Sequence, residues 1–283
     1  MLPGSPPRIE RVDARPVGIF DSGAGGLTVL HECLVTLPHE DFLYLGDSAR
    51  CPYGPRPHDE IRRFAHEIAS YLEQSGVKLI VAACNAATSA ALPALQEALE
   101  VPIVGVLVPE AHAAVQATRN RRIGLLATEA TVTSGRYEEI VHALEAGARV
   151  VSVACPKLVP LIEVGAIGEE LDAAVREYAA PLKEEDVDTV ILGCTHYPMI
   201  RRVFERVFGR RRTLVYSADK TAREVAETLA RKGVENDPAR EGSTRFLTTG
   251  SAEEFRTLGE RFLQLPIPRV EQVTVRQLEL AAT

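Results

Sequence analysis

Two short apolar runs that each end in a cysteine restrict most strongly what this chain can fold into. The first run, 79–83, leads to Cys84, and the second, 190–193, leads to Cys194. Because apolar residues follow one another there without polar alternation, each run is typical of a strand buried on both faces. The polar residues after each cysteine indicate a strand-to-helix turn. Both cysteines are therefore predicted at the carboxyl ends of parallel strands, where α/β sheets bind ligands and a helix N-terminus favours a thiolate.

Strands and helices alternate through the rest of the chain as well. Apolar residues at helical spacing predict helices, among them 59–74, 88–99, 110–118, 158–164, 169–182, 221–231 and 252–263. Short apolar runs predict strands at 17–20, 42–46, 78–82, 101–106, 122–126, 149–154, 189–192, 213–216, 244–248 and 270–275. This alternation indicates an α/β fold with mainly parallel sheets.

The second cysteine run nearly repeats the first, which predicts two similar halves. We expect two doubly wound α/β domains, the first formed by residues 17–104 together with 218–283 and the second by residues 105–217. The active site is then expected in the cleft between the two domains. Residues 1–16 are rich in proline and lack the apolar centre of a signal peptide, so they are expected to form a flexible N-terminal extension.

The composition argues against several classes of function. The formal net charge is −7, so the chain offers no large positive field for nucleic acid. No apolar run approaches the ~18 residues of a membrane span, and we expect neither nucleic acid nor membrane as a partner. The five cysteines are odd in number and include no C-x-x-C pair, which predicts reduced thiols in the cytoplasm. Cys194 and His196 lack a second ligand pair, so no metal site is predicted.

The glycine-rich segment 21–26 first suggests a phosphate-binding loop. It lacks the Gly-Lys-Ser/Thr ending of a Walker A motif, and Thr28 stands where the dinucleotide motif requires glycine. Two interpretations remain open. The segment is either a tight turn between a strand and a helix, or a strand end at which Asp21 presents its carboxylate to a ligand.

The cysteines differ in the functional weight that their positions give them. A lone buried cysteine is usually an inert small hydrophobe, so Cys33 and Cys155 are expected to have no chemical role, while Cys51 stays undecided. Cys84 and Cys194 differ because they follow equivalent strands. A single nucleophile would leave one of them unexplained, and a redox pair would have to lie within disulfide reach. Two thiols on opposite faces of one carbon fit the removal and return of a proton.

Four segments of the chain, in this order, resemble the glutamate racemases, the cofactor-independent branch of the aspartate/glutamate racemases. They are residues 18–27, 45–54, 83–88 and 193–198, and the similarity extends from about residue 17 to about residue 265. The resemblance implies an isomerase that interconverts L- and D-glutamate and supplies D-glutamate for peptidoglycan. It also implies that no pyridoxal phosphate, other cofactor or metal takes part. We expect a cytoplasmic enzyme that forms a homodimer.

The resemblance further implies roles for individual residues. Cys84 and Cys194 match the two bases, of which one removes the α-proton as a thiolate and the other protonates the opposite face as a thiol. Asp21 and His196 match groups that assist these proton transfers, and Glu163 matches a carboxylate that supports the histidine. The positions that match substrate contacts are Asp21, Ser22, Tyr53, Gly54, Asn85, Ala86, Thr128, Thr195 and His196.

Ala86 departs from the pattern, because threonine is usual at this position in that family. A hydroxyl donor to the substrate carboxylate is then missing, although the backbone N–H remains. We expect altered carboxylate binding, compensated in part by Thr88 or Thr128. Two other functions stay open: racemisation of aspartate or another amino acid, and binding of an amino acid without turnover. The presence of both cysteines favours catalysis.

Overall fold

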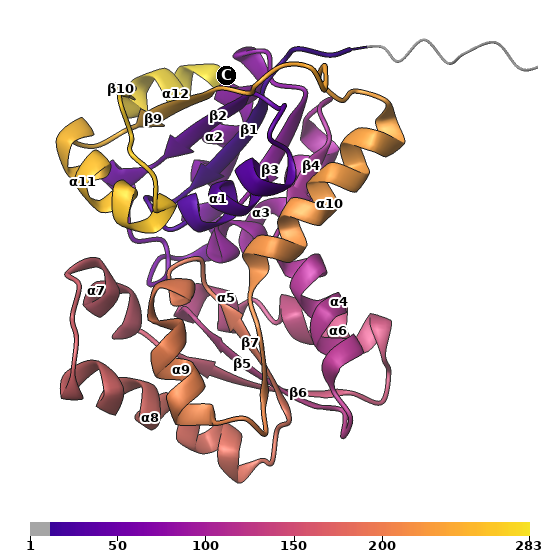
Figure 1. Ribbon diagram of the computed structural model, residues 1–283, viewed down its shortest axis with the longest axis vertical. Helices are drawn as coiled ribbons and strands as arrows, with labels where there is room; N and C mark the ends of the chain where they lie inside the picture. Colours follow the sequence, from indigo (N-terminus) through magenta and orange to yellow (C-terminus); the bar gives the residue numbers. More distant parts are fainter. Residues whose placement is uncertain (1–11) are drawn as a thin grey trace, which may run out of the picture.

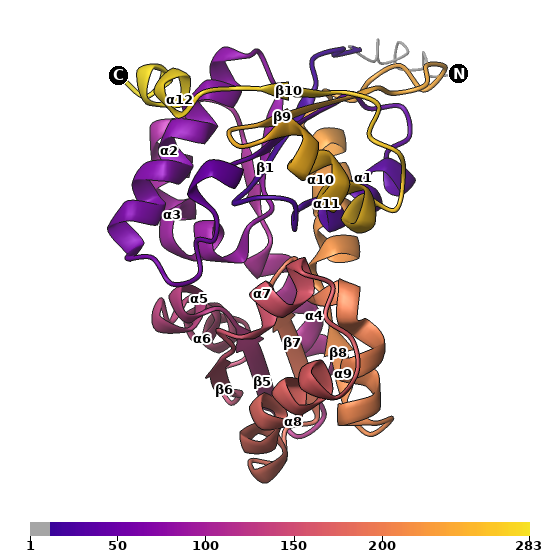
Figure 2. The same ribbon diagram turned by 90° about the vertical axis from the view of Figure 1, so that its left-hand side faces the viewer.

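The computed structural model describes residues 12–283. The chain forms two α/β lobes, one above the other in Figures 1 and 2. We call the lobe with the six-stranded sheet the first lobe and the lobe with the four-stranded sheet the second. Of the predicted N-terminal extension, residues 1–11 lie outside the described residues. In its remaining part, the Asp13 N–H donates to the Glu235 carbonyl and the Asp13 carbonyl accepts from Lys78 Nζ.

The sheet of the first lobe has the strand order β10-β9-β2-β1-β3-β4, with every neighbouring pair parallel. Its strands are β1 (Val17–Asp21), β2 (Phe42–Gly46), β3 (Leu79–Ala82), β4 (Ile103–Gly105), β9 (Thr244–Thr248) and β10 (Val270–Gln272). The C-terminal strands therefore return to the sheet that the N-terminal part begins.

The sheet of the second lobe has the order β6-β5-β7-β8 and is also parallel throughout. Its strands are β5 (Arg122–Ala127), β6 (Arg149–Ala154), β7 (Thr189–Gly193) and β8 (Thr213–Val215). The predicted α/β class with parallel sheets is confirmed. We propose that the domains follow the two sheets, with the chain passing between them near Gly105 and again near Ser217.

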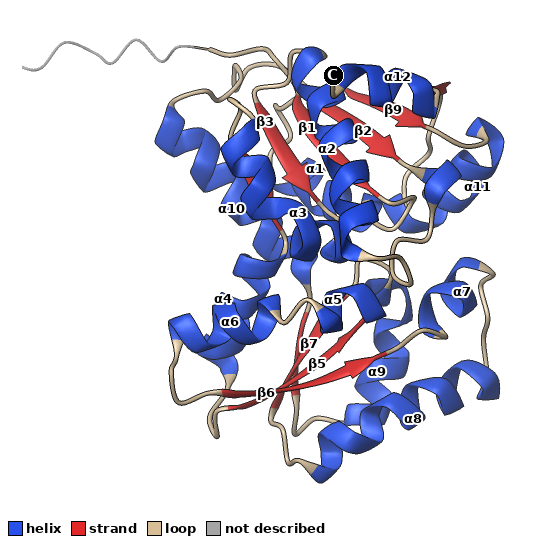
Figure 3. Cartoon of the chain, turned by 180° about the vertical axis from the view of Figure 1, so that it is seen from behind, coloured by secondary structure: helices blue, strands red, loops and turns tan. Residues whose placement is uncertain are grey.

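Helices cover both faces of the first sheet, as Figure 3 shows from behind. One face carries α1 (Leu27–Thr36), α10 (Ser217–Lys232) and α11 (Ala252–Leu263), and the other carries α2 (His58–Gln74), α3 (Asn85–Ala98) and α12 (Val275–Ala281). Successive strand residues point to opposite faces, so Ile19 packs in one apolar cluster and Phe20 in the other. This explains why the strand sequences show no polar alternation.

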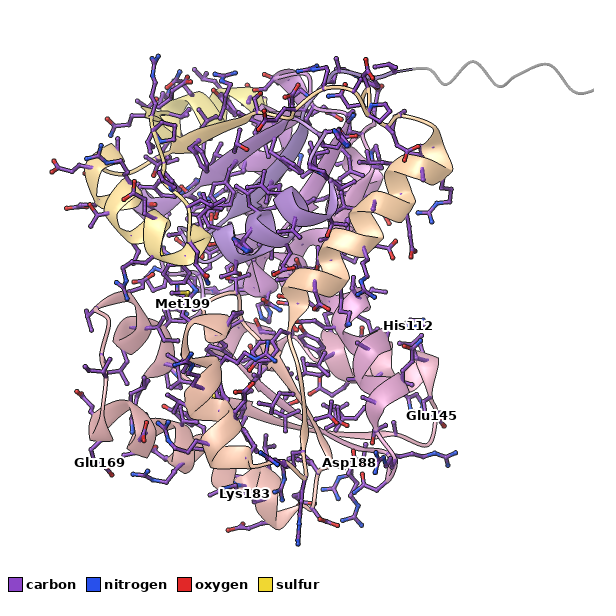
Figure 4. All side chains as sticks on the ribbon, in the orientation of Figure 1. His112, Glu145, Glu169, Lys183, Asp188 and Met199 are labelled. Atoms are coloured by element: carbon purple, nitrogen blue, oxygen red, sulfur yellow. The ribbon has the colours of Figure 1, made fainter. Side chains whose placement is uncertain are left out.

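The second lobe directs the carboxyl ends of its strands toward the first lobe. Asp188, immediately before β7, lies at the far end of the lobe in Figure 4, where it accepts the Arg119 and Asn120 N–H groups. The helices of this lobe are α4 (Leu107–Ala117), α5 (Glu129–Thr133), α6 (Arg136–Leu144), α7 (Leu158–Glu163), α8 (Glu169–Glu184) and α9 (Arg201–Phe208). Two short 3-10 turns, η1 (Ser48–Arg50) and η2 (Tyr197–Ile200), complete the described elements.

Several predicted boundaries are wrong in instructive ways. Helix α3 begins at Asn85 rather than at position 88, because Cys84 already occupies the N-cap position. The predicted strand 270–275 ends at Gln272, and α12 begins at Val275 behind a capping box formed by Thr274 and Gln277. Helix α10 begins at Ser217 rather than at the predicted position 221. No helix in residues 12–283 is long and apolar enough to cross a membrane.

Candidate active site

A cavity between the lobes brings the two predicted bases together. Cys84 follows β3 of the first lobe, Cys194 follows β7 of the second, and both line this cavity. The other predicted residues that line it are Ser22, Tyr53, Gly54, Asn85, Ala86, Thr128, Thr195 and His196. The strand ends of two parallel sheets thus face each other across one space, which is where such sheets place ligands.

Cys84 lies at the N-terminus of α3, as predicted. Its side chain is nearly buried, and burial raises the pKa of the thiol to about 12, with the Asp21 carboxylate adding to the rise. The backbone N–H of Ala87, in the first turn of α3, acts in the opposite direction, and so do the hydroxyl and N–H of Ser22. Desolvation therefore outweighs the helix terminus, and the thiol form dominates at neutral pH in the ligand-free protein.

Cys194 differs from the prediction in its surroundings. No α-helix starts beside it, because η2 follows and α9 begins only at Arg201. Burial raises the pKa of the Cys194 thiol well above its usual range, although the backbone N–H of His196 works against this shift. The expectation that a helix N-terminus favours a thiolate here is therefore wrong, since the favourable contact comes from the local backbone N–H of His196.

His196 connects Cys194 to a carboxylate. Its Nδ1 lies 3.8 Å from the Cys194 sulfur, and its Nε2 lies 3.1 Å from Oε1 of Glu163, the last residue of α7. Phe262 packs edge-on against the imidazole, with ring centroids 5.1 Å apart. A side chain that is held at both nitrogens keeps one orientation. The chain Glu163–His196–Cys194 is therefore a geometry that can deliver a proton to this thiol or withdraw one.

The glycine-rich segment serves this geometry through close packing. A Cβ atom at Gly25 would lie 2.4 Å from His196 Nδ1, and one at Gly26 would lie 2.6 Å from the Asp21 Cβ. The interpretation as a tight turn is confirmed. Asp21 is fully buried, accepts the Gly23 N–H at 3.0 Å and lies 3.5 Å from the Thr195 hydroxyl. Its carboxylate acts on Cys84 from behind the cavity wall rather than lining the cavity.

Several other polar side chains in and around the cavity already form hydrogen bonds within the protein. The Tyr53 hydroxyl donates to Asp47, so this side chain lines the cavity with its ring rather than with a free hydroxyl. Thr128 lines the cavity, and its hydroxyl lies 3.1 Å from that of Thr131. Thr88 donates its hydroxyl to the Ala82 carbonyl at 2.8 Å, so the expectation that Thr88 replaces the hydroxyl missing at Ala86 is wrong.

Sequence patterns did not single out every residue of the site. Cys51 and Cys155 also line the cavity, and the Cys51 sulfur lies 3.9 Å from Glu163 Oε1. Glu110 and Tyr137 are hydrogen-bonded to Asn85 from behind the cavity. No local motif marks these two residues, because they come from different helices. Within residues 12–283, no group of three or more His, Cys, Asp or Glu side chains could hold a metal ion.

Comparison with known proteins agrees with this geometry. The family model for Asp/Glu/Hydantoin racemase matches residues 28–225. A glutamate racemase from Parafrankia is 49% identical over 250 residues, which is 88% of this chain and 90% of that protein. Glutamate racemase RacE1 from Bacillus anthracis has a TM-score of 0.87 at 39% identity, covering 92% of this chain and 98% of that one.

A third relative was crystallised with a ligand. Glutamate racemase from Francisella tularensis, in complex with D-glutamate, has a TM-score of 0.86 at 32% identity and covers 93% of this chain and 98% of that chain. These matches extend over both lobes and confirm the resemblance found in the sequence. The chain belongs to the Asp/Glu/Hydantoin racemase family.

Proposed function

We propose that this chain is a glutamate racemase, an isomerase that interconverts L- and D-glutamate with Cys84 and Cys194 as its two bases. The observation that carries the proposal is the position of the two thiols, which line one cavity from opposite lobes. The names of the similar proteins and the D-glutamate bound to the Francisella relative support glutamate as the substrate. The family contains racemases for other substrates, so the choice of glutamate rests on these relatives.

The reaction moves one proton through a planar intermediate. One cysteine, as the thiolate, removes the α-proton, and the electron pair of the C–H bond passes into the adjoining carboxylate. The other cysteine, as the thiol, then delivers its proton to the opposite face of the same carbon. Each turnover leaves the protonation states of the two sulfurs exchanged. Asp21 near Cys84 and His196 with Glu163 near Cys194 return the protons to their starting positions.

Burial makes the Cys84 thiolate a strong base, and the positive charge of the bound substrate lowers the free energy needed to form it. With a pKa of about 12, ionising Cys84 at pH 7 in the empty site costs about 7 kcal/mol. A substrate ammonium group about 4 Å from the sulfur offsets about 4 kcal/mol of this at an effective dielectric constant near 20. The stabilising hydrogen bonds from Ala87 and Ser22 are already included in the pKa of about 12, so about 3 kcal/mol of this cost remains. The thiolate is therefore formed mainly when substrate is bound, and it is then strong enough to abstract a weakly acidic proton.

The two carboxylates of glutamate must be held by local donors, because the net charge of −7 gives no long-range attraction for an anion. Ser22, Thr128 and Thr195, with the backbone N–H groups of Gly54 and Ala86, are the proposed donors to these carboxylates. Because they come from both lobes, approach of the lobes completes the binding site and excludes water.

We further propose a cytoplasmic enzyme that works as a homodimer, without cofactor, metal or nucleic acid, and supplies D-glutamate for peptidoglycan. Its free cysteines are compatible with a reducing compartment.

Turnover by cysteine variants tests the proposal. Polarimetry with L- and D-glutamate should show racemisation by the wild type, and Cys84→Ala and Cys194→Ala should each reduce it by at least about 10³-fold, since each direction needs both sulfurs. Cys33, which is buried and does not line the cavity, provides the matched control, and Cys33→Ala should stay active. Full activity in either active-site variant contradicts the two-base proposal. Faster turnover of L-aspartate than of L-glutamate contradicts the assigned substrate, and binding without turnover indicates a non-catalytic amino-acid-binding protein.

A further inference from the structure

A buried carboxyl group lies at the junction of the lobes and has no part in the proton transfers described above. Glu110, on α4, is fully buried. Its Oε2 accepts a hydrogen bond from the Tyr137 hydroxyl and a second one from Asn85 Nδ2 at 3.1 Å. Asn85 Nδ2 also lies 2.9 Å from the Tyr137 oxygen. Glu110 and Tyr137 belong to the second lobe and Asn85 to the first, so the three side chains form a hydrogen-bonded triangle across the junction.

The triangle uses both N–H donors of the Asn85 amide. A primary amide has two such donors and one carbonyl oxygen, so no side-chain donor of Asn85 is left for a substrate carboxylate. The remaining atom, Oδ1, is buried and has no hydrogen-bond partner among residues 12–283. A buried acceptor without a partner costs about 1–3 kcal/mol. Since Asn85 lines the cavity, a donor on the bound ligand is the partner that would satisfy it.

Glu110 and Tyr137 determine which way the amide faces. In the flipped orientation, the amide carbonyl would meet Glu110 Oε2, so that an acceptor would face an acceptor. The Ser217 hydroxyl, from the first turn of α10, lies near the Glu110 carboxyl and lowers its pKa, but it makes no hydrogen bond of normal geometry with Oε1. The orientation of Asn85 therefore depends chiefly on the two residues of the second lobe.

We propose that Glu110 and Tyr137 are positioning residues that hold the Asn85 carbonyl ready to accept a hydrogen bond from the α-ammonium group of the substrate. The inference rests on the proposed function, in which the substrate is glutamate. Its ammonium group is the only N–H donor that glutamate carries, and its two carboxylates only accept. The triangle thereby selects amino acids over dicarboxylates that lack the amine. Because it spans both lobes, the selective contact exists only when the lobes are together.

Binding of two matched ligands tests this assignment. Glutarate has the two carboxylates of glutamate but no ammonium group. Calorimetry should show that Tyr137→Phe, which removes one of the two acceptors of Asn85, weakens glutamate binding about 10-fold or more, the range expected for a hydrogen bond to a charged group. The same variant should leave the glutarate dissociation constant within about twofold of the wild-type value. Glu110→Ala should resemble Tyr137→Phe, whereas Glu110→Gln keeps an acceptor oxygen and should recover most of the glutamate affinity.

Tyr216→Phe is the matched control. Tyr216 lies next to Ser217, and its buried hydroxyl has no hydrogen-bond partner in the described chain, so neither ligand should bind differently. Equal weakening of glutamate and glutarate by Tyr137→Phe would show a merely structural role, and unchanged glutamate binding would show none. Either result overturns the proposal. If Glu110→Ala fails to fold, Tyr137→Phe still decides. Racemisation by the wild type is measured separately, so that failure of the proposed function is distinguished from failure of this inference.

Discussion

Gly25→Ala perturbs one half of the site without touching either sulfur. The new Cβ would lie 2.4 Å from His196 Nδ1, 2.5 Å from its Cε1 and 2.5 Å from the Thr195 hydroxyl oxygen. Ordinary contact requires a separation about 1 Å larger, and both neighbours are buried side chains of the second lobe. The imidazole must therefore move by about 1 Å, which costs about 10²-fold in a reaction that depends on oriented groups. Overpacking also costs stability, about 1–3 kcal/mol.

The loss of activity should affect only the proton transfers of Cys194, because His196 lies beside that sulfur. Because the two enantiomers have equal free energy, kcat/KM must decrease by the same factor in both directions. Proton removal by Cys84 needs no movement of His196. Elimination from a glutamate analogue with a leaving group on Cβ needs only one proton removal, so one enantiomer of such an analogue should still be consumed near the wild-type rate. Polarimetry with glutamate and proton NMR with the analogue measure the two rates. If racemisation and the elimination from both enantiomers fall together, the reasoning is refuted.

A control separates this effect from simple destabilisation. Gly76 has a positive φ of 80°, a Cβ added to it would meet nothing within 4 Å, and it is exposed far from the cavity lining. Gly76→Ala strains the backbone and should lower the melting temperature by an amount similar to Gly25→Ala, at a cost of about 1 kcal/mol. It should leave kcat/KM unchanged. Loss of racemisation in Gly76→Ala would assign the effect of both substitutions to stability.

Two further predictions concern pH. Because burial raises the pKa of Cys84 to about 12, the reactive thiolate fraction of the free enzyme should grow with pH, and kcat/KM should rise about tenfold per unit between pH 6 and 8; a plateau beginning below pH 7 contradicts this. Burial raises the pKa of Glu110 from 4.5 to about 8, so its contribution to stability is fully present below about pH 4.5 and is lost as the pH rises through about 8. Urea unfolding should therefore show a steeper loss of stability from pH 5 to 9 in the wild type than in Glu110→Gln, by at most about 5 kcal/mol, and parallel profiles contradict it.

The apolar runs explain why so much of the fold could be predicted. A strand buried on both faces of a parallel sheet has no polar alternation, and the runs before Cys84 and Cys194 show none. The parallel topology places each cysteine at the carboxyl end of its own sheet, and the way in which the lobes meet makes the two ends face each other across one cavity. The predicted helix after Cys194 failed because the residues there suit a 3-10 turn as well, and Pro198 lies at its second position. The final helix, α12, in contrast, follows a capping box of Thr274 and Gln277, a pattern from which its start could have been predicted.

The parts of the site that the sequence did not predict depend on tertiary contacts, in one case between the lobes. Glu110 and Tyr137 meet Asn85 only because α4, α6 and α3 converge at the junction, and no local spacing records that meeting. Thr88 suited the position of a substrate donor by its place in the sequence. Its hydroxyl is instead bonded to the carbonyl of Ala82, a choice set by the geometry of the first turn of α3. Which partner such a side chain bonds to is determined by the tertiary structure.

The central claim is that two sulfurs act on opposite faces of one carbon, and the fate of solvent deuterium tests it most directly. L-Glutamate is incubated with the wild type in D₂O, and both enantiomers are separated and analysed by mass spectrometry during the first few per cent of conversion. If two sulfurs share the reaction, the D-glutamate formed carries deuterium at the α-carbon, while the remaining L-glutamate keeps its hydrogen. D-Glutamate that retains the original hydrogen would mean that one group removes and returns the same proton, and would contradict the two-base mechanism.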